Sequence, residues 1–328
     1  MKVWIFLLRR LGSTLPLFFL LPLMTFGLLH LVPGNYFDQL RLNPQISQAT
    51  VEKYEAVYHL KDPVVVQYFH WLKRVARFDL GYSFAYRRPV LEVLGSRLGN
   101  TVLLTGVSFL WAWLLAVFLG LLAARYPRAL WSRAMEGFAY AGLSIPNFFL
   151  CMLILGAASQ WGGLPLGGMR AFDHESFGFA AKWADLLRHL VIPSFVLGYG
   201  IFSFLFRLMR SQALEVLDKE FILILRAFRV SEARILFKHV IRNAINPLVT
   251  LLGMQLPVLV SGAALVEIFT GWPGLGQVML QAVRTQDIFL VLGNMVMISC
   301  LLILGNLFAD LLLVGVDPRI RVGRDVKA

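Results

Sequence analysis

The sequence predicts an all-α membrane protein with six transmembrane helices. Hydrophobic residues make up 58% of the 328 and charged residues only 15%, whereas a soluble domain is about half apolar and about a quarter charged. Six long runs carry no charged residue, and each is long enough to cross roughly 30 Å of hydrocarbon. Because backbone groups in lipid must pair within their own segment, and because runs of this length are too long for barrel strands, these runs are helices.

The first run, residues 11–29, follows a short basic N-terminus. A cleavable signal peptide has a shorter apolar core and a small-residue cleavage site, so we expect this helix to be retained. The other five runs are residues 101–124, 137–160, 190–206, 247–266 and 288–309. An even number of spans places both termini on the same side of the membrane.

Lys and Arg indicate which side that is. With the N-terminus inside, short inner segments hold 18 of the 31 basic residues, and most of the others lie in one long loop. Long loops translocate largely regardless of charge, so the short segments decide the orientation. Both termini are therefore expected in the cytoplasm, and the formal net charge of +12 reports topology and contact with anionic lipid. Nucleic acid is a poor explanation for it.

Residues 211–247, the charged loop, interrupt the apolar pattern with six basic and four acidic residues. Ser231 suits the N-cap of a helix that begins at Glu232, whose carboxylate favours the positive end of the helix dipole. Helical spacing then predicts a cationic stripe and an apolar stripe, so this short helix could lie on a bilayer or in a groove of another protein. The cationic stripe is Arg234, Lys238 and Arg242, and the apolar stripe is Phe237, Ile241, Ala244 and Leu248.

The first outer segment, residues 32–97, is long enough to hold structure of its own. Asp62 and Pro63 are typical of the start of a helix. Val65, Phe69, Leu72 and Ala76 then recur at helical spacing, with Lys73, Arg74 and Arg77 as a solvated face. We expect an amphipathic helix that Gly81 ends.

Pro146 lies inside the third run and removes a helical hydrogen bond, which predicts a kink. Kinked helices in transporters often line cavities or move, although simple packing explains a single proline equally well. The next outer loop contains the glycine-rich stretch 162–168, followed by Asp173, His174 and Glu175. Adjacent residues do not converge easily on one ion, and Cys151 and Cys300 are isolated small hydrophobes, so no metal site is predicted.

A tight turn is expected after the fifth span, where three glycines alternate with Trp272 and Pro273. The glycines are Gly271, Gly274 and Gly276. Trp272 suits the membrane interface. Glu267 is the lone ionisable residue in that half of the span, and it is either a functional intramembrane charge or a group exposed to water near the outer end.

Several of these stretches resemble the permease subunits of ABC importers for dipeptides, oligopeptides and nickel. The charged loop is similar to the family's cytoplasmic EAA loop at residues 215–217, 226–227, 231–232, 234, 239, 242–244 and 247. The ATPase-coupling candidates that the resemblance implies are Glu220, Arg226, Ala227, Arg229, Ser231, Glu232, Arg234, His239, Asn243 and Pro247. Further similarity lies in LVPGN at 31–35, LSIPNFF at 143–149, LVEIFTGWPGLGQ at 265–277 and NLFADLLLVGVDPRIR at 306–321. The resemblance therefore extends over most of the chain.

The resemblance implies the type I importer permease fold, with a sizeable outer segment after the first helix. It divides the chain into residues 1–96, which hold the first helix and the outer segment, a five-helix core at 97–316, and a cytoplasmic tail at 317–328. Two positions depart from the family pattern, because Leu225 and Arg229 replace an alanine and a glycine. A glycine permits a left-handed turn that arginine adopts only at a cost. Either the turn is built differently here or the subunit engages its ATPase less well.

The function implied is that of half of an import pathway in the bacterial inner membrane. The partners implied are a second, related permease, two ATPase subunits and an external binding protein that delivers peptides. The chain contains no Gly-Lys dipeptide and therefore no phosphate loop, so ATP and magnesium are expected on the partner ATPases and no cofactor on this chain. We expect no catalytic residue and no enzymatic activity. The gate candidates are Pro146, Glu267 and the turn at 271–276.

Other classes remain open at this point. A nickel or metal-chelate permease of the same family shares these motifs. An ion-driven secondary transporter would show polar residues at mid-membrane, where these spans are nearly free of charge. An intramembrane enzyme would carry a recognisable nucleophile or metal motif, and neither H-E-x-x-H nor G-x-S-x-G occurs. A channel or an exporter half fits the composition but not the resemblance.

Overall fold

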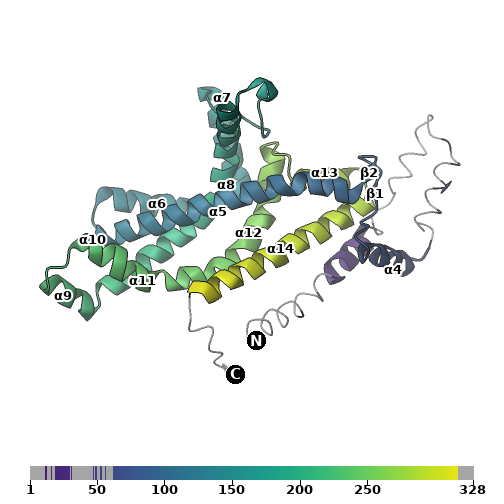
Figure 1. Ribbon diagram of the computed structural model, residues 1–328. Helices are drawn as coiled ribbons and strands as arrows, with labels where there is room; N and C mark the ends of the chain where they lie inside the picture. Colours follow the sequence, from purple (N-terminus) through teal and green to yellow (C-terminus); the bar gives the residue numbers. More distant parts are fainter. Residues whose placement is uncertain are drawn as a thin grey trace. The chain divides into compact units, whose positions relative to one another are not determined.

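A computed structural model describes residues 62–316, the helix Phe19–Leu29 and a few isolated residues before 62. Within these ranges, the side chains of residues 250, 252–257 and 308–316 lie outside the described part. Figure 1 shows the order of the elements. The chain forms two compact units, which are described separately. Unit 1 combines Met1–Thr101 with Pro273–Ile303, and unit 2 combines Val102–Trp272 with Leu304–Ala328. The start of the first apolar run, most of the segment before residue 62 and the tail from 317 lie outside the described residues.

Unit 1 surrounds one apolar core. It contains helix α4 (Val64–Val75), a short antiparallel hairpin of β1 (Tyr82–Ser83) and β2 (Arg88–Pro89), the start of α5 (Val90–Arg125), helix α13 (Leu275–Arg284) and the start of α14 (Ile288–Val316). The amphipathic helix expected after Pro63 is present, but it ends at Val75, before the predicted end at Gly81. Its buried face consists of Gln67, Tyr68 and Trp71, whereas Val65 and Phe69 are more than half exposed. Val65, Phe69 and Ala76 of the predicted apolar stripe therefore lie on the outer side of α4, whereas Leu72 packs against the core.

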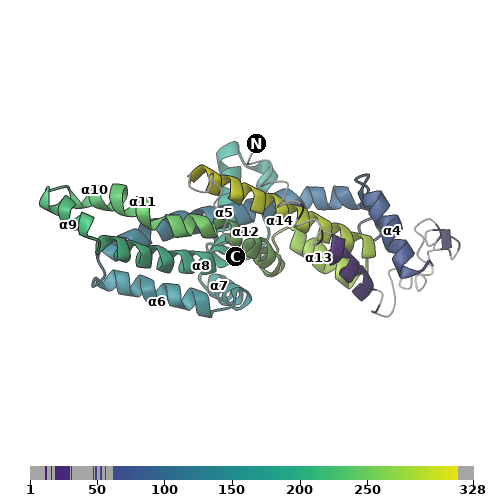
Figure 2. The same cartoon turned by 90° about the horizontal axis from the view of Figure 1, so that it is seen from below.

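Unit 2 is built on α8 (Phe179–Leu217), a helix of 39 residues. Around it are the rest of α5, α6 (Leu130–Ser144), α7 (Asn147–Trp161), the 3-10 turn η1 (His174–Ser176) and α12 (Asn246–Phe269). Helix α6 lies alongside α8 in both views (Figure 1 and Figure 2). The two helices approach closely because position 142 carries no side chain, and the Tyr199 hydroxyl donates a hydrogen bond to the Phe138 carbonyl at 2.6 Å.

The number of membrane spans is only partly fixed by the described residues. Three helices there are long and apolar enough to cross a membrane: α5, α8 and the Ile288–Leu307 part of α14. The bent pair α6 and α7 raises the number to four if it counts as one span. Phe19–Leu29 and Val258–Phe269 are shorter apolar helices. Six spans therefore stay a prediction.

The third apolar run is two helices, which corrects the expectation of one kinked span. Helix α6 ends at Ser144, Pro146 is the extended N-cap of α7, and the two axes differ by 115°. Proline cannot donate the hydrogen bond that would continue α6, and it disfavours helical backbone in the residue before it. Helix α7 has 15 residues, which is about 22 Å of helix and less than the roughly 30 Å of a hydrocarbon core.

Candidate functional site: the charged loop

The charged loop is helical over most of its length. Helix α8 runs on to Leu217 and is followed by α9 (Glu220–Ala227), a short turn, and α10 (Glu232–Arg234). Helix α10 passes directly into a π-helical stretch, Ile235–Val240, and then into α11 (Ile241–Ala244). Ser231 has the extended backbone of an N-cap, as predicted, although its side chain makes no capping hydrogen bond.

The turn between α9 and α10 has the left-handed form that the family's glycine would favour. Arg229 has φ +54°, its N–H donates to the Arg226 carbonyl at 2.9 Å, and the Val230 N–H donates to the Leu225 carbonyl at 3.1 Å. These two bonds form a Schellman motif, which satisfies the last carbonyls of a helix. Of the two alternatives raised by the sequence, a differently built turn is therefore wrong. Arginine adopts the strained conformation itself.

Glu232 joins three helices through its carboxylate. Arg226 of α9 donates from Nε to Oε1 at 2.9 Å and from Nη2 to Oε2 at 3.4 Å. Arg125, the last residue of α5, places its Nε 3.0 Å from Oε2. The hydrogen bond from Arg226, together with the positive charge of Arg125, holds the pKa of Glu232 below its ordinary value even though partial burial opposes this. No pattern in the sequence connects Arg125 with this loop, because the two are about a hundred residues apart.

The π-helical stretch changes which side chains face the core. A π-helix bonds residue i to i+5, so it rotates the following residues relative to an α-helix. The fully or nearly fully buried positions are Ile235, Leu236, Val240, Ala244 and Leu248. Phe237, expected on the apolar stripe, is instead 48% exposed and stacks on Phe118 at 6.2 Å between ring centroids. The predicted stripe was therefore wrong at its first position.

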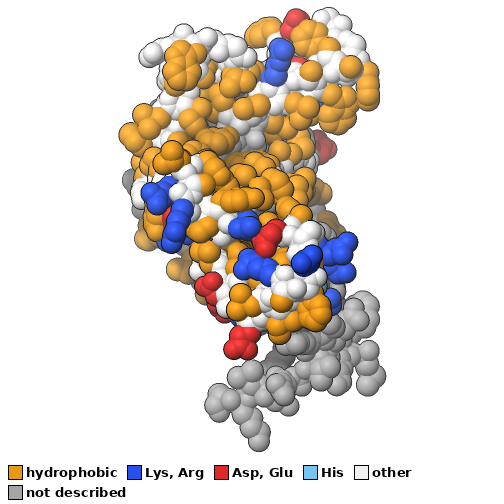
Figure 3. Space-filling view, turned by 90° about the vertical axis from the view of Figure 1, so that its left-hand side faces the viewer, with side chains coloured by type: hydrophobic (Ala, Val, Ile, Leu, Met, Phe, Trp, Pro, Cys, Tyr) orange, Lys and Arg blue, Asp and Glu red, His pale blue; other side chains and the backbone are white. Residues whose placement is uncertain are grey.

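The tip of the loop is apolar and exposed. Leu223, Ile224 and Phe228 are 61%, 55% and 78% exposed, whereas Ile222 on the same helix is completely buried. Figure 3 views the molecule from the end that carries α9 and α10, and basic and acidic side chains gather there beside hydrophobic ones. Contiguous exposed apolar residues rimmed by charge are typical of a protein-binding surface.

The remaining predicted residues of the loop are distributed along these helices. Glu220 is the first residue of α9 and Ala227 the last, and both are exposed. Arg234 is exposed at the end of α10. The Asn243 side-chain amide donates to the His239 carbonyl at 2.8 Å, and Pro247 is in the first turn of α12. The structure thus brings the side chains of Arg226 and Glu232 together and links Asn243 to the His239 backbone, while the other predicted residues are spread along the loop.

The GWPG turn (residues 271–274) begins in unit 2. Gly271 has φ +64°, and the Gly168 N–H donates to the Thr270 carbonyl at 2.9 Å. A Cβ at Gly167 would come within 2.9 Å of the same carbonyl oxygen. The glycine-rich stretch 162–168 therefore packs directly on this turn. Trp272 is completely buried, so its side chain packs inside the protein, and its place at the membrane interface stays a prediction.

The continuation of the turn belongs to unit 1. The Pro273 carbonyl accepts a hydrogen bond from Asn100 Nδ2 at 2.8 Å, and the Leu275 N–H donates to Thr101 Oγ1 at 2.9 Å. Asn294 Nδ2 donates to the Leu275 carbonyl at 2.8 Å. Gly274 is the N-cap of α13, and Gly276 is buried in its first turn. Helix α13 was missed by the sequence analysis. Asn294 was a detectable signal, because a lone amide in an apolar run needs a partner.

Glu267 lies in α12 and is completely buried within this chain. Of the two interpretations offered by the sequence, simple exposure to water is therefore contradicted. A buried ionisable residue inside an apolar helix stays a candidate for function.

His174 is held by a residue that the sequence analysis did not consider. Its Nδ1 lies 2.6 Å from Asp185 Oδ2, and His189 Nδ1 lies 3.2 Å from the other oxygen of the same carboxylate. Asp185 Oδ2 also accepts from the Ala171 N–H at 3.0 Å. Glu175 is largely exposed and pairs with Lys182. These contacts fix the loop after α7 to the start of α8, and over the described residues no three His, Cys, Asp or Glu form a group suited to a metal ion.

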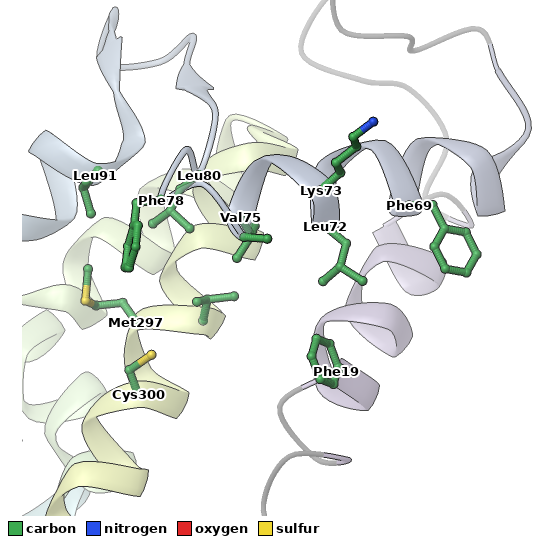
Figure 4. A pocket seen from close by; sticks show the side chains of 12 residues that line it. Phe19, Phe69, Leu72, Lys73, Val75, Phe78, Leu80, Leu91, Met297 and Cys300 are labelled. Atoms are coloured by element: carbon green, nitrogen blue, oxygen red, sulfur yellow. The ribbon is translucent and has the colours of Figure 1, made fainter.

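Unit 1 contains an apolar pocket of about 780 Å³ (Figure 4). Its lining includes Phe69, Leu72, Phe78 and Met297, and the ammonium group of Lys73 points away from these side chains. Such a lining offers no partner for the charged ends of a peptide. The pocket is therefore a poor candidate for a substrate site.

Comparisons with known proteins identify the family of the chain. A family model described as "Binding-protein-dependent transport system inner membrane component" matches residues 116–322, and its N-terminal counterpart matches residues 3–105. The chain is 34% identical over 317 residues to the oligopeptide transport system permease protein AppB of Bacillus subtilis, covering 96% of this chain and 98% of that protein. It is 32% identical over 333 residues to the dipeptide permease DppB of Escherichia coli K12, with the same coverage.

Two further likenesses extend these findings. The glutathione transport system permease protein GsiC of Escherichia coli is 30% identical over 319 residues, covering 96% of this chain and 98% of that protein. Among solved structures, an inward-facing form of the MetNI methionine ABC transporter matches with a TM-score of 0.52 at 20% identity. It covers 69% of this chain and 97% of that one. At that identity the structural likeness shows the fold alone.

Proposed function

The chain belongs to the family of binding-protein-dependent transport system inner membrane components, and from that premise we propose how it is coupled, what it carries and with what it assembles. It is a permease subunit of an ABC importer and not an enzyme. It is an integral protein of the inner membrane.

The proposed substrates are peptides, delivered by an external binding protein. Relatives at 34% and 32% identity over nearly the whole chain are named oligopeptide and dipeptide permeases. A third relative is named for glutathione, which is itself a small peptide. These names favour peptides over a nickel chelate, and the family match argues against an ion-driven transporter.

The proposed partners are a second related permease, two ATPase subunits that hold ATP and magnesium, and the lipid bilayer. This arrangement leaves no cofactor and no nucleic acid on the chain itself. We also propose six spans with both termini in the cytoplasm, the division at residues 96 and 316, and the charged loop on the cytoplasmic side. The excess of basic residues in the short inner segments supports that orientation.

The charged loop is proposed to receive the ATPase at the exposed tip formed by Leu223, Ile224 and Phe228. The observation that supports this most is the contrast between that tip and the buried side chains directly behind it, since Ile222, Ile235 and Leu236 pack into the core of unit 2. Because these buried side chains anchor the tip, a displacement of the tip by the ATPase would also displace the core of unit 2.

Glu232 is proposed to couple this displacement to α5, because its carboxylate joins α9 and α10 to the end of that helix. Closure of two ATPase subunits would then displace the loop as a rigid lever, and the spans of the two permeases would rock between inward-facing and outward-facing states. We propose that three features line or gate the translocation pathway: the GWPG turn, Glu267 and the break at Pro146. The backbone contact of Gly168 with Thr270 supports a rigid turn there.

The test replaces the tip and asks whether ATPases still co-purify. Leu223→Asp together with Phe228→Asp should abolish co-purification and transport while membrane insertion stays normal. Phe172→Asp is the matched control, because Phe172 is fully exposed but lies in the loop before η1. Retention of ATPases and transport in the double variant would refute the coupling role of the loop. Labelling of a single cysteine at position 237 from outside the cell would refute its orientation.

A further inference from the structure

Helices α6 and α8, which approach closely at Gly142, also line a pocket of about 400 Å³. The pocket lies toward the end of α8 that leads into the charged loop. Helix α6 contributes Glu136 and Tyr140, one turn apart. Helix α8 contributes Phe204, Arg207, Leu208, Arg210 and Ser211. Four of the α8 residues recur at the i, i+3, i+4 and i+7 spacing of one helix face.

The two arginines leave hydrogen-bond donors unused in this pocket. The Arg207 guanidinium lies over the Tyr140 ring, 4.2 Å from its centroid, and among the described residues it pairs with no carboxylate. Arg210 donates from Nη1 to Glu136 Oε1 at 3.1 Å, but its Nε is buried and has no partner in the part of the chain that the structure describes. A guanidinium carries five N–H groups, and a buried donor without an acceptor costs free energy.

The charge and the lining of the pocket favour an amphipathic ligand, one that carries both a negative charge and an apolar group. Two arginines and one carboxylate give a formal charge of +1. Tyr140 and Phe204 line the mouth and are 50% and 37% exposed, so one side of the pocket is open and aromatic. Amphipathic residues of this kind are typical of the boundary between hydrocarbon and headgroups.

We propose that this pocket binds the phosphate group of an anionic membrane phospholipid. The Arg207 guanidinium donates to phosphate oxygens, the nearby Arg210 guanidinium contributes its positive charge, and the Ser211 hydroxyl supplies another donor. The glycerol backbone and the first acyl carbons lie along Phe204 and Leu208. Arginine suits a phosphate because its planar fork matches two oxygens at once, and basic pockets between membrane helices are suited to lipid headgroups.

The position of the pocket gives the lipid a role. Its last lining residue, Ser211, is the first residue of the charged loop, and helix α8 continues for about two more turns to Leu217. A lipid bound there ties α6 to α8 next to the proposed ATPase site. That the lipid belongs to the cytoplasmic leaflet follows from the orientation given under the proposed function. The binding chemistry does not depend on that orientation.

The test uses the purified transport complex in nanodiscs of either phosphatidylglycerol or phosphatidylcholine, followed by native mass spectrometry of the released complex. Phosphatidylglycerol should remain bound and phosphatidylcholine should not. Arg207→Gln should weaken retention at least about tenfold, the range expected for losing one charge-assisted hydrogen bond. Arg207→Lys should weaken it less, because the charge remains without the fork. Arg188→Gln is the matched control, since Arg188 is an exposed arginine near the other end of the same helix.

A second variant protects the test against misfolding. Arg210→Gln alone would leave Glu136 without its partner, so it is combined with Glu136→Gln, and the double variant should also lose the lipid. Equal retention of both lipids, or full retention by Arg207→Gln, would overturn the proposal. Displacement of the lipid by excess inorganic phosphate would also overturn it, because the site would then be one for free phosphate. Lipid retention is measured with no assay of transport or of ATP hydrolysis. A failure of the lipid proposal is therefore distinguishable from a failure of the proposed function.

Discussion

Arg125 Nε lies 3.0 Å from Glu232 Oε2 and so connects the last residue of α5 with the first residue of α10. Because Arg226 bonds to the same carboxylate, one acidic residue holds two arginines that come from helices far apart in the sequence. The charged loop is therefore fastened to the first helix of the core as well as to its own neighbouring helix.

Reversing the charge of Glu232 should release the loop. Glu232→Arg would face Arg125 and Arg226, and each partly exposed pair lost is worth about 0.2–1 kcal/mol. We expect faster hydrogen exchange over residues 226–234 and several-fold slower transport. Adding Arg226→Glu should restore these only in part, and adding Arg125→Glu as well should restore them further. If the double and triple variants behave alike, Arg125 has no part in the coupling.

The same carboxylate predicts a pH dependence. The hydrogen bond from Arg226 and the charge of Arg125 hold the pKa of Glu232 below its ordinary value of 4.5. A lowered pKa in the folded state stabilises the loop above pH 4.5, and this contribution is lost as the pH falls through the lowered pKa. Exchange in residues 226–234, corrected for intrinsic rates, should therefore rise below pH 4.5 in the wild type. In Glu232→Gln no such step should occur, and an identical step there would assign it to another group.

Arg229→Gly should stabilise the turn between α9 and α10. Arginine has φ +54° there, and glycine removes a penalty of roughly 1–2 kcal/mol for a left-handed residue. Arg229→Ala is the control, because alanine keeps that penalty and removes only the charged side chain. Local opening measured by hydrogen exchange should be suppressed in the glycine variant alone. Equal protection in both variants would mean that the side chain, and not the backbone, decides the stability of the turn.

Two glycines of α6 should respond in opposite directions to alanine. A Cβ at Gly142 would lie 2.8 Å from the Tyr199 ring and would also collide with the Ser203 hydroxyl, whereas Gly137 has open space around it. Gly137→Ala should stabilise the protein by about 0.5–1 kcal/mol through helix propensity. Gly142→Ala should destabilise it by about 1–3 kcal/mol through overpacking. Thermal unfolding of the solubilised protein measures both, and destabilisation by Gly137→Ala would contradict the packing described here.

Much of the charged loop followed from local sequence. Ser231 and Glu232 signal a helix start through capping and the dipole, and α10 begins there. Apolar runs free of charge predicted α5, α8 and α14. Runs of that length are too long for barrel strands, so only a helix can pair all of their backbone hydrogen-bonding groups in lipid. Period and composition are properties of neighbouring residues, so one sequence suffices to detect them.

Contacts between distant segments were not accessible in this way. The pairing of Arg125 with Glu232, the docking of Gly168 on Thr270 and the burial of Trp272 each depend on where separate helices meet. The π-helical turn at 235–240 moved Phe237 out of the expected stripe, and Pro146 broke a run that composition marked as continuous. The sequence alone determined that the protein is a helical membrane protein and where its longest apolar helices lie, since both depend on local hydrophobicity. Only the tertiary structure decided which charges pair and which faces are buried, because those depend on packing between helices that the one-dimensional pattern does not contain.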